Sequence, residues 1–376
     1  MDTAYAVLTI DLDAVRANWR QCNSLMKNGK AAAVVKADAY GLGMEKVAPA
    51  LAAAGAETFF VATIDEGIRL RGLLPSHEIQ ILGGLLPGTE PVFLEHRLTP
   101  MLNSLGDLER WQTFCHSKRT PLAASLHVDT GMLRLGLPPD ELGRLVAEPE
   151  RLTGVTLSAL ISHLACADEA GHPLTDQQQR DFCEAYRLLR PALGSSVRLS
   201  LANSSGLHRG AEFHFDLARP GCALYGVNPT PEATNPMAQP VVLQGKILQI
   251  RHVDTPRTVG YGASHQAQKG QIIATVGVGY ADGYLRYLSN RGTVFVGGQP
   301  APVVGRVSMD LITIDVTGVE EINAHPGALV DLIGPDNPVD AVAEAARTIG
   351  YEILTSLGPR YRRVYTQETE ASERIL

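Results

Sequence analysis

The chain has 376 residues, of which 45% are hydrophobic and 19% are charged. This composition excludes a disordered chain, and the length exceeds one ordinary domain of roughly 100–200 residues. The 33 Lys and Arg against 40 Asp and Glu give a net charge of −7, and no basic block stands out, so we expect no nucleic-acid partner. No apolar run approaches the roughly 20 residues of a membrane-spanning helix, so we expect no membrane partner either.

The first residues and the cysteines favour a cytoplasmic location. Asp2, Asp11 and Asp13 stand where a secretory signal would carry basic residues, and no cleavage pattern follows. The five cysteines are scattered and never occur in C-x-x-C spacing, so we expect neither a metal site nor a disulfide framework. A soluble, cytoplasmic protein is the expectation.

From about residue 30 to residue 225, short apolar runs alternate with amphipathic segments. The runs lie at 31–40, 58–63, 79–84, 98–103, 124–131, 157–165, 197–206 and 215–221. Near-continuous apolar runs are typical of parallel strands buried on both faces. Eight strands close a (β/α)8 barrel, although no long helical pattern separates the third run from the fourth. We therefore expect an α/β fold with an N-terminal (β/α)8 barrel over residues 1–232.

The pattern changes after a proline-rich segment at 226–240, which disfavours a regular helix or strand. Beyond it the hydrophobic period is two, as in strands with one buried face. GGQP at 297–300 is typical of a hairpin turn. We expect a mainly antiparallel β domain over residues 233–376, closed by a helix near 339–350.

Polar residues follow several of the expected barrel strands. Active sites of such barrels lie at the C-terminal ends of the strands, so these residues are the first candidates for one convergent site. They are Lys36, Asp38, Tyr40, His127, Asp129, Arg134, His163, Asn203, Ser204 and Arg219. Partial burial of Lys36 would lower its pKa and free the amine as a nucleophile. Its position alone favours an exposed lysine at a strand end.

The sequence around Lys36 resembles a known family. AVVKADAYGLG, at 33–43, closely resembles the pyridoxal phosphate motif of the alanine racemases, enzymes of fold type III that depend on this cofactor. Further segments are similar to the family in the same order and at similar spacing. They are HVDTGMLRLG, HLACAD, ANSSG, RPGCALYG, VGYGASH, GYADGYLR, GRVSMD and YEIL.

The resemblance implies roles for individual residues. Lys36 and Tyr261 would be the two bases that move the Cα proton on opposite faces, with pyridoxal 5'-phosphate as electron sink. Arg134 and the backbone of Met309 would bind the substrate carboxylate. The family further implies a head-to-tail homodimer in which each site borrows Tyr261 and Met309 from its neighbour. The implied cofactor-binding residues are Lys36, Tyr40, His163, Asn203, Ser204, Arg219, Gly221, Cys222 and Tyr351.

Two positions depart from the family pattern. Several members carry a carbamylated lysine seven residues before the Arg134 position, where this chain has His127. Since histidine forms no such stable carbamate, the Arg134 side chain would be held in place either by a bound anion such as chloride or by Asp129. Leu42 replaces a common histidine, and no loss of cofactor binding is expected from it.

The resemblance implies an isomerase, an alanine racemase that supplies D-alanine for peptidoglycan and cell wall biogenesis. One alternative is a serine or broad-specificity racemase of the same fold. A related decarboxylase would need acidic residues for a distal amine, and the sequence offers no convincing candidate. A non-catalytic pyridoxal phosphate carrier would resemble the barrel alone, so the second domain and Tyr261 argue against it.

Overall fold

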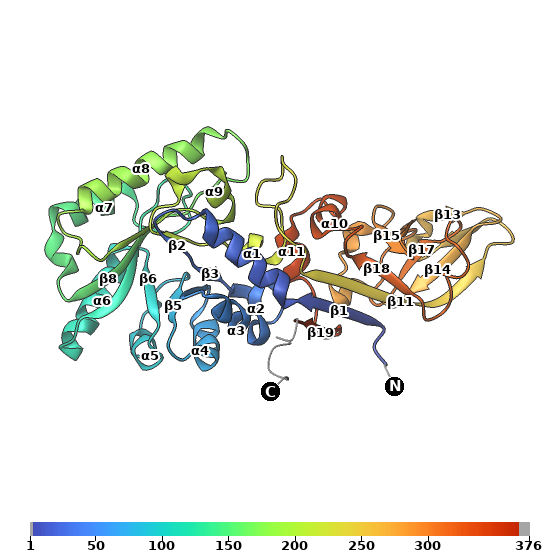
Figure 1. The fold of residues 1–376 in the computed structure, drawn as a ribbon, viewed down its shortest axis with the longest axis horizontal. Helices are drawn as coiled ribbons and strands as arrows, with labels where there is room; N and C mark the ends of the chain where they lie inside the picture. Colours follow the sequence, from blue (N-terminus) through green and yellow to red (C-terminus); the bar gives the residue numbers. More distant parts are fainter. Residues whose placement is uncertain (1–2, 368–376) are drawn as a thin grey trace, which may run out of the picture.

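The computed structural model describes residues 3–367, which form a barrel and an elongated second domain side by side (Figure 1). Seven parallel strands follow one another in the order β3 to β9, and β10 pairs in parallel with β2. The strands are β2 (Lys30–Ala31), β3 (Ala33–Val34), β4 (Thr58–Val61), β5 (Glu78–Ile81), β6 (Thr99–Leu102), β7 (Leu122–His127), β8 (Val155–Ile161), β9 (Arg198–Ser200) and β10 (Leu217–Ala218).

Hydrogen bonds close this ring of strands. The Asp216 amide donates to the Leu199 carbonyl at 3.0 Å, which joins the segment before β10 to β9. The Ala32 amide donates to the Ala218 carbonyl at 2.8 Å, which joins β10 to the segment between β2 and β3. The predicted α/β class, with a barrel and a β domain, is confirmed.

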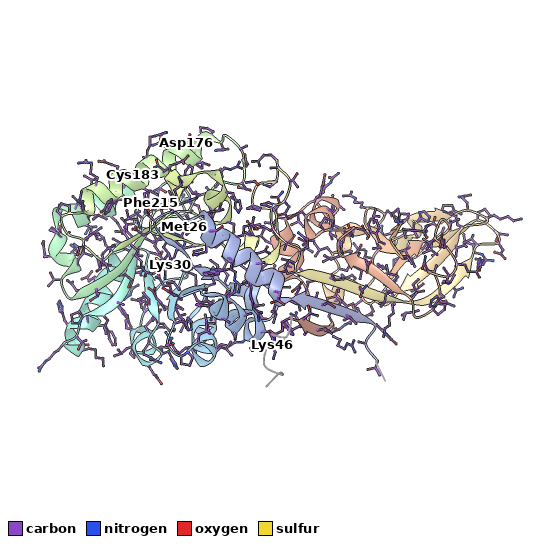
Figure 2. All side chains as sticks on the ribbon, in the orientation of Figure 1. Met26, Lys30, Lys46, Asp176, Cys183 and Phe215 are labelled. Atoms are coloured by element: carbon purple, nitrogen blue, oxygen red, sulfur yellow. The ribbon has the colours of Figure 1, made fainter. Side chains whose placement is uncertain are left out.

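Helices cover the outside of the barrel, and their ends follow local sequence signals. Asp11 caps the first helix by accepting hydrogen bonds from the amides of Asp13 and Ala14. In Figure 2, Asp176 and Cys183 lie on the opposite side of the barrel from Lys46, because the helices ring the strands. The barrel helices are α1 (Leu12–Leu25), α3 (Met44–Ala54), α4 (Ile64–Leu73), α5 (Glu90–Glu95), α6 (Leu105–Lys118), α7 (Pro139–Ala147), α8 (Pro173–Leu189) and α9 (Ser204–Arg209). The segment labelled α2 (Lys36–Tyr40) is a left-handed turn directly after the barrel strand β3.

The second domain is built on mostly antiparallel strands, and segment 226–240 before it contains no helix or strand. Gly297 and Gly298 both have positive φ, which makes the tight turn between β15 and β16 possible. Its elements are β11 (Val241–His252), β12 (Arg257–Val259), β13 (His265–Ala267), β14 (Ile272–Val276), β15 (Thr293–Val296), β16 (Gln299–Pro302), β17 (Ile312–Asp315), β18 (Leu329–Ile333), α10 (Val339–Ala345), α11 (Gly350–Thr355) and β19 (Arg362–Thr366).

The first strand of the chain also belongs to this sheet. β1 (Ala6–Asp11) pairs antiparallel with β11 and parallel with β19. Its side chains alternate between buried and half-buried, with Leu8 and Ile10 in the core. β1 therefore belongs to the sheet of the second domain, although it precedes the barrel strands in the sequence. Across residues 3–367, no helix combines the length and apolar character needed to cross a membrane.

Candidate active site

A cavity of about 530 Å³ lies at the C-terminal ends of the barrel strands. Its walls include Val34 at the end of β3, His127 at the end of β7 and Ile161 at the end of β8. All nine predicted cofactor-binding residues line this single cavity, together with Arg134. The structure therefore brings together residues that span more than 300 positions of sequence, as one convergent site requires.

Lys36 enters the cavity from a strained stretch of backbone. The four residues after it, Ala37–Tyr40, all have positive φ between 52° and 56°. A left-handed conformation costs roughly 1–2 kcal/mol for each residue with a Cβ, so the fold holds this turn against its preference. Burial, and then the nearby charge of Arg134, lower the pKa of the Lys36 amine. The lowered pKa favours the neutral amine, which is the nucleophilic form.

Arg219 lies at the buried wall of the cavity, with only 5% of its surface exposed. Its guanidinium donates to Ser200 Oγ and to the Ser162 carbonyl, both at 2.5 Å. Within residues 3–367 it has no carboxylate partner. The carboxylate of Asp216, a nearby acid, instead accepts from the Leu199 amide.

His163 lies beside Arg219, whose Nη2 donates to His163 Nδ1 at 3.4 Å. Burial and the positive charge of Arg219 hold the pKa of His163 well below its ordinary value. Burial lowers the pKa of Arg219 to about 9. At neutral pH the pair is therefore a charged guanidinium beside a neutral imidazole, which places positive charge deep in the cavity.

Several other residues that line the cavity are polar but uncharged. Ser204 Oγ accepts from the amides of Gly221 at 2.9 Å and Ala223 at 3.3 Å. A Cβ on Gly221 would lie 2.3 Å from Tyr40 Oη, so only glycine allows this close approach. Tyr40 stacks on Tyr225 with ring centroids 4.6 Å apart. Hydroxyl groups and backbone amides converge here, as they do in sites that hold an anion by neutral donors.

The loop after β7 carries Arg134. Asp129 accepts hydrogen bonds from the amides of Gly131, Met132 and Leu133, at 2.9, 2.9 and 3.2 Å. In the described part of the chain, Arg134 forms no ion pair with Asp129 or any other acid. The expectation that Asp129 sets Arg134 by direct contact is therefore wrong, because the loop's own amides occupy the carboxylate.

His127 stands beneath this loop and is held by Asn103. His127 Nδ1 lies 2.8 Å from Asn103 Oδ1, and since the amide oxygen only accepts, Nδ1 carries the proton. Burial, and then the charge of Arg219, together lower the pKa of His127 to about 4. His127 is thus a neutral residue in a cavity that already holds Lys36, Arg134 and Arg219.

Comparison with known proteins identifies the relatives of this chain. The family model described as "Alanine racemase, N-terminal domain" matches residues 10–229, and "Alanine racemase, C-terminal domain" matches residues 241–365. The chain belongs to the alanine racemase family. It is 52% identical over 373 residues to the alanine racemase of Rhodospirillum rubrum, covering 99% of this chain and 98% of the relative.

Two further relatives of the family are informative. The crystal structure of alanine racemase from Bartonella henselae with covalently bound pyridoxal phosphate is 40% identical, with a TM-score of 0.91. The two structures superpose over 96% of this chain and 100% of the Bartonella henselae chain. A protein of Mesorhizobium japonicum named "Alanine racemase, catabolic" is 44% identical over 96% of this chain and 93% of its own length.

Two residues with roles implied by the alanine racemase family lie outside the cavity. Tyr261 is 72% exposed and Met309 is 53% exposed, and neither lines the cavity that holds Lys36. Tyr261 begins the short helix η4 (Tyr261–Ala263), between β12 and β13. Figure 1 places β13 at the far end of the second domain, away from the barrel. A single chain therefore does not bring these two residues to Lys36.

Four residues that hold the cavity-lining side chains and the Lys36 turn in place were not predicted from the sequence. Ser162 and Ser200 bind the Arg219 guanidinium, Asn103 holds His127, and Glu66 binds the turn after Lys36. Glu66 did carry a signal, because Thr63 and Glu66 have the spacing of a capping box at the start of a helix. Ser162 and Ser200 lie inside apolar runs, where a buried polar residue needs a partner.

Proposed function

We propose that this chain is an alanine racemase that interconverts L-alanine and D-alanine with pyridoxal 5'-phosphate as its cofactor. The observation that carries the proposal is one cavity that joins Lys36, Arg219 and the Ser204–Gly221 pair, in a chain that matches both domains of the family. We further propose that the protein acts in the cytoplasm and that its D-alanine serves peptidoglycan synthesis.

The residues present fit this cofactor. The hydroxyl groups of Ser204, which accepts from the Gly221 amide and keeps its own proton to donate, and of Tyr40 suit its phosphate, and the lowered pKa of Lys36 suits attachment to its aldehyde. Arg219 would face the ring nitrogen, and since its guanidinium keeps its proton at neutral pH, that nitrogen would receive none from it. When bound, pyridoxal phosphate supplies an electron sink for negative charge at Cα.

The chain's own residues would orient the substrate and move the proton. Arg134 would hold the substrate carboxylate, for which a planar guanidinium has matching geometry. Lys36 Nζ would remove or return the Cα proton on one face. A second base is needed on the other face, and the two tyrosines that line the cavity, Tyr40 and Tyr351, are both assigned to the cofactor.

We propose that Tyr261 of a second copy is that base, in a head-to-tail homodimer that also brings in Met309. Tyr261 and Met309 are both exposed, so their side chains are accessible to a second copy of the chain. Leu133, beside Arg134 on the barrel, is 91% exposed and would lie near the same interface. The head-to-tail order follows from the placement of Tyr261 and Lys36 in different domains.

Measuring D-alanine formed from L-alanine by the purified protein, with pyridoxal phosphate added, tests the proposal. Lys36→Ala should abolish the reaction, while the wild type should prefer L-alanine to L-serine. Comparable rates with both substrates would replace the proposal by a broad-specificity racemase. Growth of a D-alanine auxotroph carrying the gene, and its absence with Lys36→Ala, tests the role in peptidoglycan. Cell fractionation tests the location.

A further inference from the structure

The turn that carries Lys36 is held from outside the cavity by helix α4. Glu66 Oε1 accepts a hydrogen bond from the Ala37 amide at 2.6 Å, directly after the lysine. Glu66 Oε2 accepts from the Ala62 amide at 2.8 Å and the Thr63 amide at 3.3 Å. One carboxylate therefore joins the turn after β3 to the end of β4 and the start of α4.

A second residue on the same face of α4 supports this contact. Arg69, three positions after Glu66, donates to Asp38 Oδ1 at 2.8 Å. Asp38 Oδ1 also accepts from the Met44 amide at 3.0 Å, so its position is fixed from two sides. The two anchored residues, Ala37 and Asp38, are the first two of the four left-handed residues.

The turn needs such anchors because its residues do not favour it. Ala37, Asp38, Ala39 and Tyr40 each carry a Cβ, and none is a glycine that adopts positive φ at little cost. Four such residues in a row persist only where their surroundings impose the conformation. Glu66 binds where the turn begins, at the residue that follows the reactive lysine.

We propose that Glu66 is a positioning residue, whose carboxylate clamps the left-handed turn and thereby fixes where Lys36 Nζ lies in the cavity. Its negative charge also opposes the lowering of the Lys36 pKa by Arg134 and Arg219. The proposal deepens the proposed function and rests on it for the identity of the cofactor, but not for the structure of the turn.

The first test is amide hydrogen exchange in the cofactor-free protein, which needs no activity. We compare Glu66→Gln with Glu45→Gln, since Glu45 also pairs with Arg69 but makes no hydrogen bond to the turn. Glutamine has one acceptor oxygen, so it cannot serve both sides of the clamp. Exchange over residues 37–43 should accelerate at least about tenfold in Glu66→Gln and stay within about twofold in Glu45→Gln. Equal exchange in the two variants would overturn the clamp.

The second test measures the equilibrium constant for pyridoxal phosphate binding to the apoprotein. Affinity should fall about tenfold or more in Glu66→Gln and remain unchanged in Glu45→Gln. Glu66→Asp keeps the charge and shortens the reach, so it should also lose affinity if the carboxylate acts by position. Unchanged affinity in both Glu66 variants would overturn the proposal.

A rescue variant separates the clamp from a general loss of folding. Ala37→Gly lowers the cost of the left-handed conformation, so Glu66→Gln with Ala37→Gly should recover part of the lost affinity. Absence of any recovery, with both variants folded by circular dichroism, would count against a clamp on this turn. A wild type that binds no pyridoxal phosphate would refute the proposed function instead, and hydrogen exchange would still decide the clamp.

Discussion

Replacing His127 by glutamine should make the protein less sensitive to acid. The pKa of His127 falls from an ordinary value of 6.5 to about 4 in the folded chain, through burial and the charge of Arg219, while Asp129 opposes the change. Between these two values the unfolded chain binds the extra proton, so stability is lost as the pH falls from about 6.5 to about 4. Above pH 6.5 the contribution of His127 is fully present.

The size of this effect follows from the two pKa values. A difference of about 2.5 pK units, at 1.36 kcal/mol for each unit, corresponds to about 3 kcal/mol near pH 4. The assay is urea unfolding of wild type and His127→Gln, followed by circular dichroism between pH 7.5 and 4. The wild-type free energy of unfolding should fall by about 3 kcal/mol more than that of the variant. If the free energies of unfolding of wild type and His127→Gln changed in parallel between pH 7.5 and 4, a buried, neutral His127 would be refuted.

Three further predictions concern the dimer, the cofactor and the core. Mixed Lys36→Ala and Tyr261→Phe proteins should regain racemase activity after subunit exchange, because a hybrid dimer holds one intact site; no recovery would contradict the shared site. Ser204→Ala removes the acceptor of the Gly221 amide at 2.9 Å, so the dissociation constant for pyridoxal phosphate should rise about tenfold, and an unchanged constant would contradict this role. Trp111 is fully buried, so Trp111→Ala should lower the free energy of unfolding by about 3–5 kcal/mol in urea titrations, and a loss below about 1 kcal/mol would contradict its place in the core.

The elements that depend on local pattern were predictable. Near-continuous apolar runs became the parallel barrel strands, and GGQP became the turn between β15 and β16. The short helix α5 agrees with the weak helical pattern between the third and fourth runs. Part of the cavity lining was also predictable, because the nine predicted cofactor-binding residues and Arg134 follow a barrel strand or lie in a motif shared with the family.

Features that depend on tertiary contacts were not predictable. Nothing in the sequence Ala37–Tyr40 signals four left-handed residues, since no glycine occurs there and the anchors lie about 30 positions away on α4. The pairing of β1 with β11 joins segments more than 200 positions apart, and a period of two does not name a partner strand. The spacing of residues in the sequence also could not show that the Asp129 carboxylate accepts hydrogen bonds from the amides of its own loop.

The most direct test of the central claim follows the Cα–H signal and the chirality of L-alanine together in heavy water, with pyridoxal phosphate and the wild-type protein. We predict that the Cα proton exchanges with solvent as D-alanine appears, and that Lys36→Ala stops both. Cofactor binding without exchange or loss of chirality would contradict a racemase and would favour a pyridoxal phosphate carrier.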